Sequence, residues 1–232
     1  MKIAVAGVGY VGLVTAVTLA DVGHDVICLD VDKGKLKMLK EGISPIYEYG
    51  LEELMLKNRE RLEFTDDVTK YSEAQVIIIG VGTPEKEDGS ADLSAVFSAA
   101  DSIADNCSDG TVVVVKSTVP IGTCENVRRR IGERRPDLHF FVVSNPEFLS
   151  QGTAVRDTFN ADSYIGWAET GRIADGQKFL ATITHTDVVP EGNGWDADPY
   201  TVRVRDGWLL GRGVADDKGP MVATLYALKF LK

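Results

Sequence analysis

Three glycines near the N-terminus have the spacing of a phosphate-binding turn. Gly7, Gly9 and Gly12 form the pattern G-x-G-x-x-G directly after the apolar run 3–6. In that context the first glycine permits a tight turn, the second leaves room for a pyrophosphate, and the third lets a helix pack closely on the strand. The N-terminus of that helix offers unpaired N–H groups and a positive dipole end to the phosphates.

An acidic residue follows at the distance that this motif requires. Asp30 closes a second apolar run, residues 26–29. Its carboxylate can accept hydrogen bonds from a ribose diol, and its charge would repel a 2′-phosphate. The sequence therefore predicts a dinucleotide site that prefers NAD to NADP.

Polar side chains also follow three later apolar runs, residues 75–81, 111–116 and 139–144. Thr83, Thr118 and Glu147 lie in the segments directly after these runs. Each segment alone is explained equally well by turn chemistry, since Thr, Ser, Pro and Asn are ordinary loop residues. Three such segments beside the glycine motif favour a site.

The elements that would position these residues alternate between strand and helix. Continuous Val and Ile runs suit strands that are covered on both faces. The expected strands are residues 2–6, 25–30, 75–81, 111–116 and 139–144, and the expected helices are residues 10–22, 33–40, 50–57, 93–106 and 122–134. This pattern predicts an α/β fold with a doubly wound, Rossmann-like parallel sheet, whose ligands bind at the carboxyl ends of the strands.

Composition narrows the class of protein. The 232 residues carry a formal net charge of −10, which argues against nucleic acid and against anionic membranes as partners. No apolar run approaches the roughly 20 residues that span a bilayer, and no signal-peptide layout is present. Cys28, Cys107 and Cys124 have no C-x-x-C spacing, so we expect reduced thiols in a cytoplasmic protein.

Five stretches within residues 1–166 carry a resemblance to a known family. They read GVGYVG, SPIYEYGLEELM, VGTPEKEDGSADLS, VKSTVPIGT and NPEFLSQGTAVRDTFNADSYIG. Together they resemble the N-terminal domain of the UDP-glucose/GDP-mannose dehydrogenase family. The resemblance implies NAD as cofactor and a nucleotide sugar whose C6 alcohol is oxidised to a carboxylate in two steps.

The same resemblance implies roles for individual residues. The implied cofactor contacts are Gly7, Gly9, Val11, Gly12, Asp30, Lys35, Thr83, Thr118 and Gln151. Thr118 and Glu147 are also implied to lie at the reacting carbon, where they would order water and transfer a proton. Ser150 and Gln151 depart from the family, which usually has Arg or Ala followed by Glu; a glutamine can hydrogen-bond but cannot take up a proton.

The resemblance also implies a cysteine nucleophile, because the second oxidation passes through a thiohemiacetal and a thioester. The family places that cysteine in a GGxCxPKD segment, and none of the three cysteines has this context. We therefore expect an NAD-binding part with an incomplete catalytic set, and its activity as an enzyme is left open. An oligomer is compatible with the family.

The last part of the chain resembles a different family. All three tryptophans lie after residue 166, and residues 174–232 resemble the first metal-binding stretch of the M20 zinc-dependent peptidases. The resemblance implies His185 and Asp216 as metal ligands, and zinc would bind only if the set were complete, since zinc takes three or four ligands. We expect a chimeric chain with an NAD-binding domain (1–166), a junction (167–173) and a short C-terminal α/β fragment (174–232). The alternative function is an M20-type peptidase or deacylase fragment, also incomplete.

Overall fold

The computed structural model describes residues 1–147, 149–159, 167–169, 203–205 and 208–210. The chain divides into two compact units. One comprises Met1–Ala161 and Gly166–Asp175, and the other comprises Asp162–Ile165 and Gly176–Lys232. The described residues of the second unit are an antiparallel hairpin of β8 (Arg203–Arg205) and β9 (Trp208–Leu210). The rest of the expected C-terminal α/β fragment lies outside the described residues.

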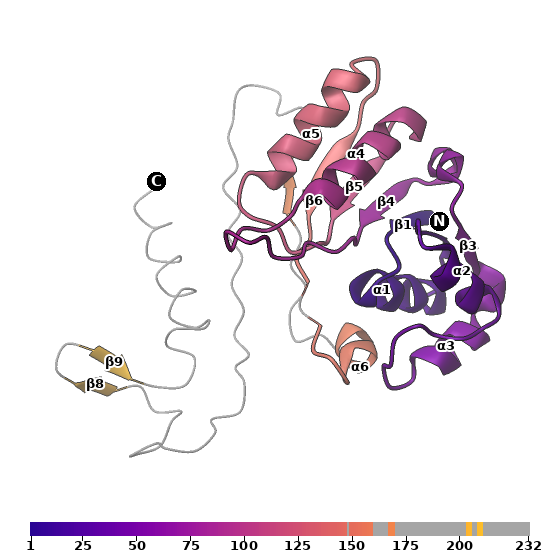
Figure 1. Ribbon diagram of the computed structural model, residues 1–232, viewed down its shortest axis with the longest axis horizontal. Coiled ribbons are helices and arrows are strands. Elements are labelled where there is room, and N and C mark those ends of the chain that lie inside the picture. The colour runs from indigo at the N-terminus through magenta and orange to yellow at the C-terminus, as the bar shows by residue number, and fades with distance from the viewer. Residues whose placement is uncertain (148, 160–166, 170–202, 206–207, 211–232) are drawn as a thin grey trace. The chain divides into compact units, whose positions relative to one another are not determined.

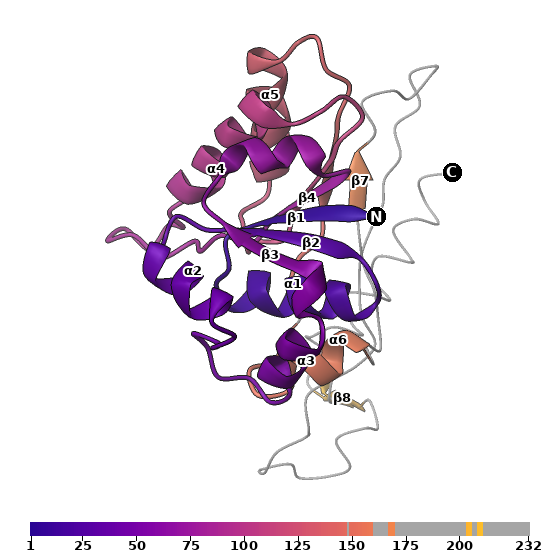
Figure 2. The ribbon, with the colours of Figure 1, turned by 90° about the vertical axis from the view of Figure 1, so that its right-hand side faces the viewer.

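The first unit is built on one sheet (Figures 1 and 2). Its strand order is β3-β2-β1-β4-β5-β6-β7, in which the first six strands are parallel and β7 is antiparallel to β6. The strands are β1 (Lys2–Ala6), β2 (Asp25–Leu29), β3 (Leu62–Thr65), β4 (Val76–Ile79), β5 (Val112–Val115), β6 (Phe141–Ser144) and β7 (Trp167–Glu169). The chain builds outward from β1 to β3 and then restarts at β4 on the other side of β1, so the order reverses between β1 and β4. Ligands of open parallel sheets bind at such a reversal point.

Helices cover both faces of this sheet (Figure 2). One core contains α1 (Tyr10–Asp21), α3 (Leu51–Lys57) and α6 (Ala154–Phe159), and α2 (Lys33–Lys40) adds Leu39 to it. The other core contains α4 (Ser94–Asn106) and α5 (Thr123–Arg134), together with the 3-10 turn Val68–Glu73. A second 3-10 turn, Arg59–Arg61, leads into β3.

Alternation along β1 shows why this sheet needs two covers. Ile3 and Val5 belong to the core with α1, whereas Ala4 and Ala6 belong to the core with α4 and α5. Successive strand residues point to opposite faces, so a strand that is apolar at every position must be buried on both sides. This is the doubly wound arrangement that the sequence predicts, and the prediction is confirmed.

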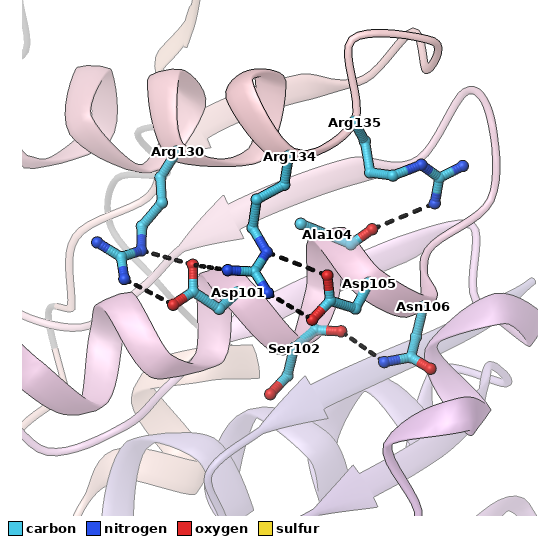
Figure 3. A network of polar contacts seen from close by, with 8 residues as sticks. All are labelled: Asp101, Ser102, Ala104, Asp105, Asn106, Arg130, Arg134 and Arg135. Atoms are coloured by element: carbon cyan, nitrogen blue, oxygen red, sulfur yellow. Dashed lines mark hydrogen bonds and ion pairs between the residues drawn. The ribbon is translucent and has the colours of Figure 1, made fainter.

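Helices α4 and α5 are also joined by three carboxylate–guanidinium ion pairs, among them Arg134–Asp101 over 3.7 Å (Figure 3). Arg130 donates from Nε and Nη2 to Asp101 over 2.5 and 2.6 Å, and Arg134 donates to Asp105 over 3.0 and 2.9 Å. The guanidinium of Arg130 also lies 5.6 Å from the ring centroid of Phe97. These ion pairs therefore connect the exposed sides of α4 and α5, in addition to the apolar contact that the two helices share.

Two strands were not predicted. β3 forms one edge of the sheet, and β7 lies in the stretch that the sequence assigned to a junction. The domain boundary itself stays a prediction. Among the described residues, no helix is both long enough and apolar enough to cross a membrane.

Candidate dinucleotide-binding site

The glycine turn has the geometry that the sequence predicts. Gly7 has a φ of +90°, and its N–H donates to the carbonyl of Leu29 over 2.7 Å. A Cβ at Gly12 would lie 1.8 Å from the carbonyl oxygen of Gly7, so helix α1 can pack here only without a side chain. A Cβ at Gly9, in contrast, would meet nothing within 4 Å. Gly9 therefore borders open space at the position where a pyrophosphate would approach.

The N-terminus of α1 is not capped by any side chain. Gly9 is its N-cap residue, and the first turn contains no acidic residue. Helix α2 differs, because the Asp32 carboxylate caps it by accepting from the N–H groups of Gly34 and Lys35 over 2.9 and 3.1 Å. The positive end of α1 thus remains available to an anion. Val11, in this first turn, is half-buried.

Asp30 lies at the end of β2 and faces the glycine turn. Its Oδ2 accepts from the N–H of Val8 over 2.9 Å and lies 3.3 Å from Nζ of Lys35, while its Oδ1 accepts from the N–H of Asp32 over 2.9 Å. The Asp30 side chain is 8% exposed. Donors on three sides therefore fix the orientation of this carboxylate, and Lys35 offsets its charge.

The loops after β4 and β5 are tied together. The Thr83 hydroxyl donates to the carbonyl of Thr118 over 2.8 Å, and the buried Ser117 hydroxyl donates to the carbonyl of Val81 over 2.6 Å. The Thr118 residue itself is exposed. These bonds hold Thr83 and Thr118 side by side at the carboxyl edge, on the β4 side of the reversal point.

Glu147 follows β6 at the same edge. Its Oε1 accepts from the N–H of Leu149, whereas its Oε2 is buried and has no hydrogen-bond partner. Burial raises the pKa of this carboxyl and outweighs the backbone bond and the charge of Lys116, both of which lower it. Lys116 is itself buried enough to lower its pKa, and its Nζ donates to Oδ1 of Asn145 over 3.1 Å. Burial thus favours the protonated form of this carboxyl more than in a solvent-exposed glutamate.

Sequence reasoning missed Glu48, which is 6% exposed and bonds the start of α1 to the turn before α6. Gln151 lies in that turn and is exposed. Glu48 lies in SPIYEYGLEELM, one of the stretches that carry the family resemblance, but its role was not predicted because its partners lie far away along the chain.

The implied metal ligands His185 and Asp216 lie outside the described residues and stay predictions. Within the part of the chain that the structure describes, no group of three or more His, Cys, Asp or Glu residues could hold a metal ion. A hollow of about 360 Å³ between α2, α3 and β3 is lined by Leu39, Met55 and Phe64 among others. It contains none of the predicted site residues.

Two family models match different parts of the sequence. Residues 1–184 match the family model of the UDP-glucose/GDP-mannose dehydrogenase family, NAD binding domain. Residues 181–232 match the model of peptidase family M20/M25/M40.

Curated relatives and solved structures agree with the first match. The chain is 50% identical over 169 residues to the UDP-glucose 6-dehydrogenase of Rhizobium meliloti, covering 71% of this chain and 39% of the relative. It is 47% identical to the UDP-glucose 6-dehydrogenase YwqF of Bacillus subtilis, over 71% of this chain and 38% of the relative. The chain thus spans about two fifths of the length of these relatives.

Among solved structures, a UDP-glucose dehydrogenase from Pyrobaculum islandicum superposes with a TM-score of 0.67 at 39% identity, covering 72% of this chain and 40% of that one. A GDP-mannose dehydrogenase from Pseudomonas aeruginosa gives a TM-score of 0.64 at 37% identity, over 68% and 38% of the two chains. The glycine turn, the uncapped helix and Asp30 lie in the matched region and fit NAD. The chain belongs to the UDP-glucose/GDP-mannose dehydrogenase family and contains its NAD-binding domain.

Proposed function

We propose that this chain binds NAD across the carboxyl edge of the sheet as the NAD-binding part of a nucleotide-sugar 6-dehydrogenase. The observation that supports this most is the pairing of an uncapped helix N-terminus at Gly9 with a fixed carboxylate at Asp30. The first turn of α1, where Val11 and Gly12 offer backbone N–H groups, would hold the pyrophosphate. Asp30 accepts from the ribose hydroxyls, and Lys35 stabilises the carboxylate.

The remaining site residues serve the nicotinamide half and the substrate. NAD supplies the hydride acceptor when it is bound. Thr83, Thr118 and Gln151 contact the cofactor, and Thr118 also orders water at the reacting carbon. Glu147 holds and releases a proton at its unpartnered Oε2. The substrate class is a nucleotide sugar, by analogy with the UDP-glucose 6-dehydrogenases that share this domain.

A titration with NADH and NADPH tests the cofactor assignment. We expect NADH to bind at least about tenfold more tightly than NADPH, because a 2′-phosphate beside a buried carboxylate is repelled. Asp30→Asn should weaken NADH and narrow this preference. Asp32→Asn is the matched control, since Asn also caps a helix and Asp32 faces α2. Equal or tighter binding of NADPH by the unaltered chain would contradict the role of Asp30.

A second function is favoured by one observation, the match of residues 181–232 to the M20 peptidases. His185 and Asp216 would be its metal ligands, but two ligands are too few for tight zinc binding. We therefore expect the purified chain to retain less than stoichiometric zinc after dialysis, and its melting temperature to rise with NADH and not with zinc. Stoichiometric zinc that is lost in a His185→Ala variant would favour the peptidase reading instead.

A further inference from the structure

Glu48 is an acidic residue buried between two exposed aromatic ones. The Glu48 residue is 6% exposed, whereas its neighbours Tyr47 and Tyr49 are 91% and 80% exposed. This inverts the usual preference, since a charged side chain is rarely buried unless it is paired or hydrogen-bonded. The chain therefore directs this carboxylate inward toward particular partners.

The partners of Glu48 come from two distant segments. Its Oε2 accepts from the phenol of Tyr10 and from the N–H of Gly152 over 2.8 Å, and its Oε1 accepts from the N–H of Ala154 over 2.9 Å. Burial raises the pKa of Glu48, but the bonds from Tyr10, Gly152 and Ala154 outweigh it and leave the pKa lowered. The same contact, together with burial, raises the pKa of Tyr10. Glu48 is thus an ionised hub whose bonds are all made to protein.

Both segments belong to the proposed cofactor site. Tyr10 is the first residue of α1, directly after Gly9. Gly152 directly follows Gln151, a proposed cofactor contact. It also comes five residues after Glu147, the proposed proton carrier, so Glu48 holds the end of the segment that contains both residues. Helix α1 and α6 also contact each other, and the carboxylate lies at the start of α6, where a negative charge is favourable.

We infer that Glu48 is a positioning residue of the cofactor site, which fixes the turn carrying Gln151 against the N-terminal end of α1. Binding of NAD to α1 and ordering of residues 150–154 are then coupled through one carboxylate. The coupling is reciprocal, as any linkage between two equilibria must be. NADH should therefore slow amide exchange at Gly152 and Ala154.

A carboxylate at the other end of α1 supplies a matched control. Asp21 accepts from Nζ of Lys57 over 2.6 Å and from Nδ2 of Asn58 over 2.8 Å, and its side chain is 18% exposed. It ties α1 to the end of α3 and touches no proposed site residue. Asp21→Asn and Glu48→Gln each weaken a carboxylate contact of the same helix, and only Glu48→Gln does so beside the site.

The experiment measures NADH affinity, melting temperature and amide exchange in the full chain. We expect Glu48→Gln to weaken NADH about tenfold, in line with the loss of bonds to a charged acceptor, and to speed exchange at Gly152 and Ala154. Asp21→Asn should lower the melting temperature and leave NADH affinity within twofold. Faster exchange in Glu48→Gln with unchanged NADH affinity would show a purely structural role and overturn the inference.

Tyr10→Phe keeps the test decisive if Glu48→Gln does not fold, because it removes only the phenol oxygen. It should weaken NADH about threefold, and an affinity equal to that of the unaltered chain would overturn the inference. Since the inference rests on the proposed function, the unaltered chain is titrated first. Failure of that chain to bind NADH would reject the proposed function, whereas binding that no Glu48 or Tyr10 variant alters would reject only the positioning role.

Discussion

Gly9 and Gly12 are needed for different reasons, Gly12 for close packing and Gly9 for cofactor binding, and substitution by alanine can separate the two. Gly12→Ala places a Cβ 1.8 Å from the Gly7 carbonyl oxygen, whereas Gly9→Ala adds a methyl group to open space. We expect Gly12→Ala to lower stability by about 2–4 kcal/mol, as overpacking against backbone does, and Gly9→Ala to fold normally but lose NADH affinity. Chemical denaturation and NADH titration measure the two effects. A Gly12→Ala chain as stable as the unaltered one would contradict the close approach of α1.

A second prediction at the scale of single residues concerns the effect of Lys116 on the pKa of Glu147. Burial raises the pKa of Glu147, whereas the N–H of Leu149 and the Lys116 cation lower it. Removing the cation in Lys116→Met should therefore raise the pKa of Glu147 further, and Lys116→Arg should leave it nearly unchanged. Carboxyl ¹³C titration by NMR, assigned with Glu147→Gln, measures this. Superimposable titrations in the unaltered chain and Lys116→Met would show that Lys116 does not act on Glu147.

Residue types with a chemical role can be recognised locally, and residues with a positional role cannot. Gly7, Gly12 and Asp30 were predicted because spacing alone encodes a turn, a close contact and a ribose acceptor. Glu48 was missed because two of its partners are 104 and 106 residues away. Glu147 was predicted as a site residue, but its buried oxygen without a hydrogen-bond partner could not be predicted, because burial depends on the folded structure.

At the scale of elements, the pairs between α4 and α5 predict a pH-dependent difference in stability. Hydrogen bonding to Arg130 holds the pKa of Asp101 below its usual value, so the bond stabilises the fold above the unfolded pKa of about 3.9 and is lost as the pH falls through the lowered folded pKa. Asp101→Asn should therefore melt lower than the unaltered chain at pH 7, and the gap should close below about pH 4. Because both side chains are partly exposed, 46% for Arg130 and 23% for Asp101, solvent screens the pair and the gap should be small. A gap that stays constant down to pH 3 would assign the effect to something other than ionisation.

Secondary structure was predictable where a segment's own pattern was strong. The Val and Ile runs of β4 and β5 stood out, as did the helical spacing of α4. The four residues of β3 (LEFT) alternate too briefly to distinguish a strand from a loop, and their pairing with β2 spans more than 30 residues. β7 has three residues and depends on β6 as a template. Edge strands of this kind are determined by the sheet that they join.

At the scale of the whole molecule, the cysteines predict that the chain does not turn over nucleotide sugars. Cys28 is fully buried in β2 and Cys107 is buried after α4, and burial raises the pKa of both thiols. Cys124 lies in the first turn of α5 and packs against the apolar core. Nucleophilic cysteines need an accessible thiolate, so we expect NADH binding without NADH production from UDP-glucose. Sustained NADH production that survives Cys124→Ser and repurification would show that a nucleophile has been overlooked.

The central position of β1 has a consequence for how the chain is made. β1 is synthesised before both of its neighbours in the sheet, yet it pairs with β2 and also with β4, whose residues lie more than 70 positions later. Until β4 has been synthesised, one edge of β1 has unsatisfied backbone groups, and the apolar face that packs on α4 and α5 lacks its cover. Pairing over such separations is slow, and exposed strand edges promote aggregation. A nascent chain that has not yet reached β4 therefore exposes one edge and one apolar face of β1, and this is the stage of synthesis at which aggregation through β1 is most favoured.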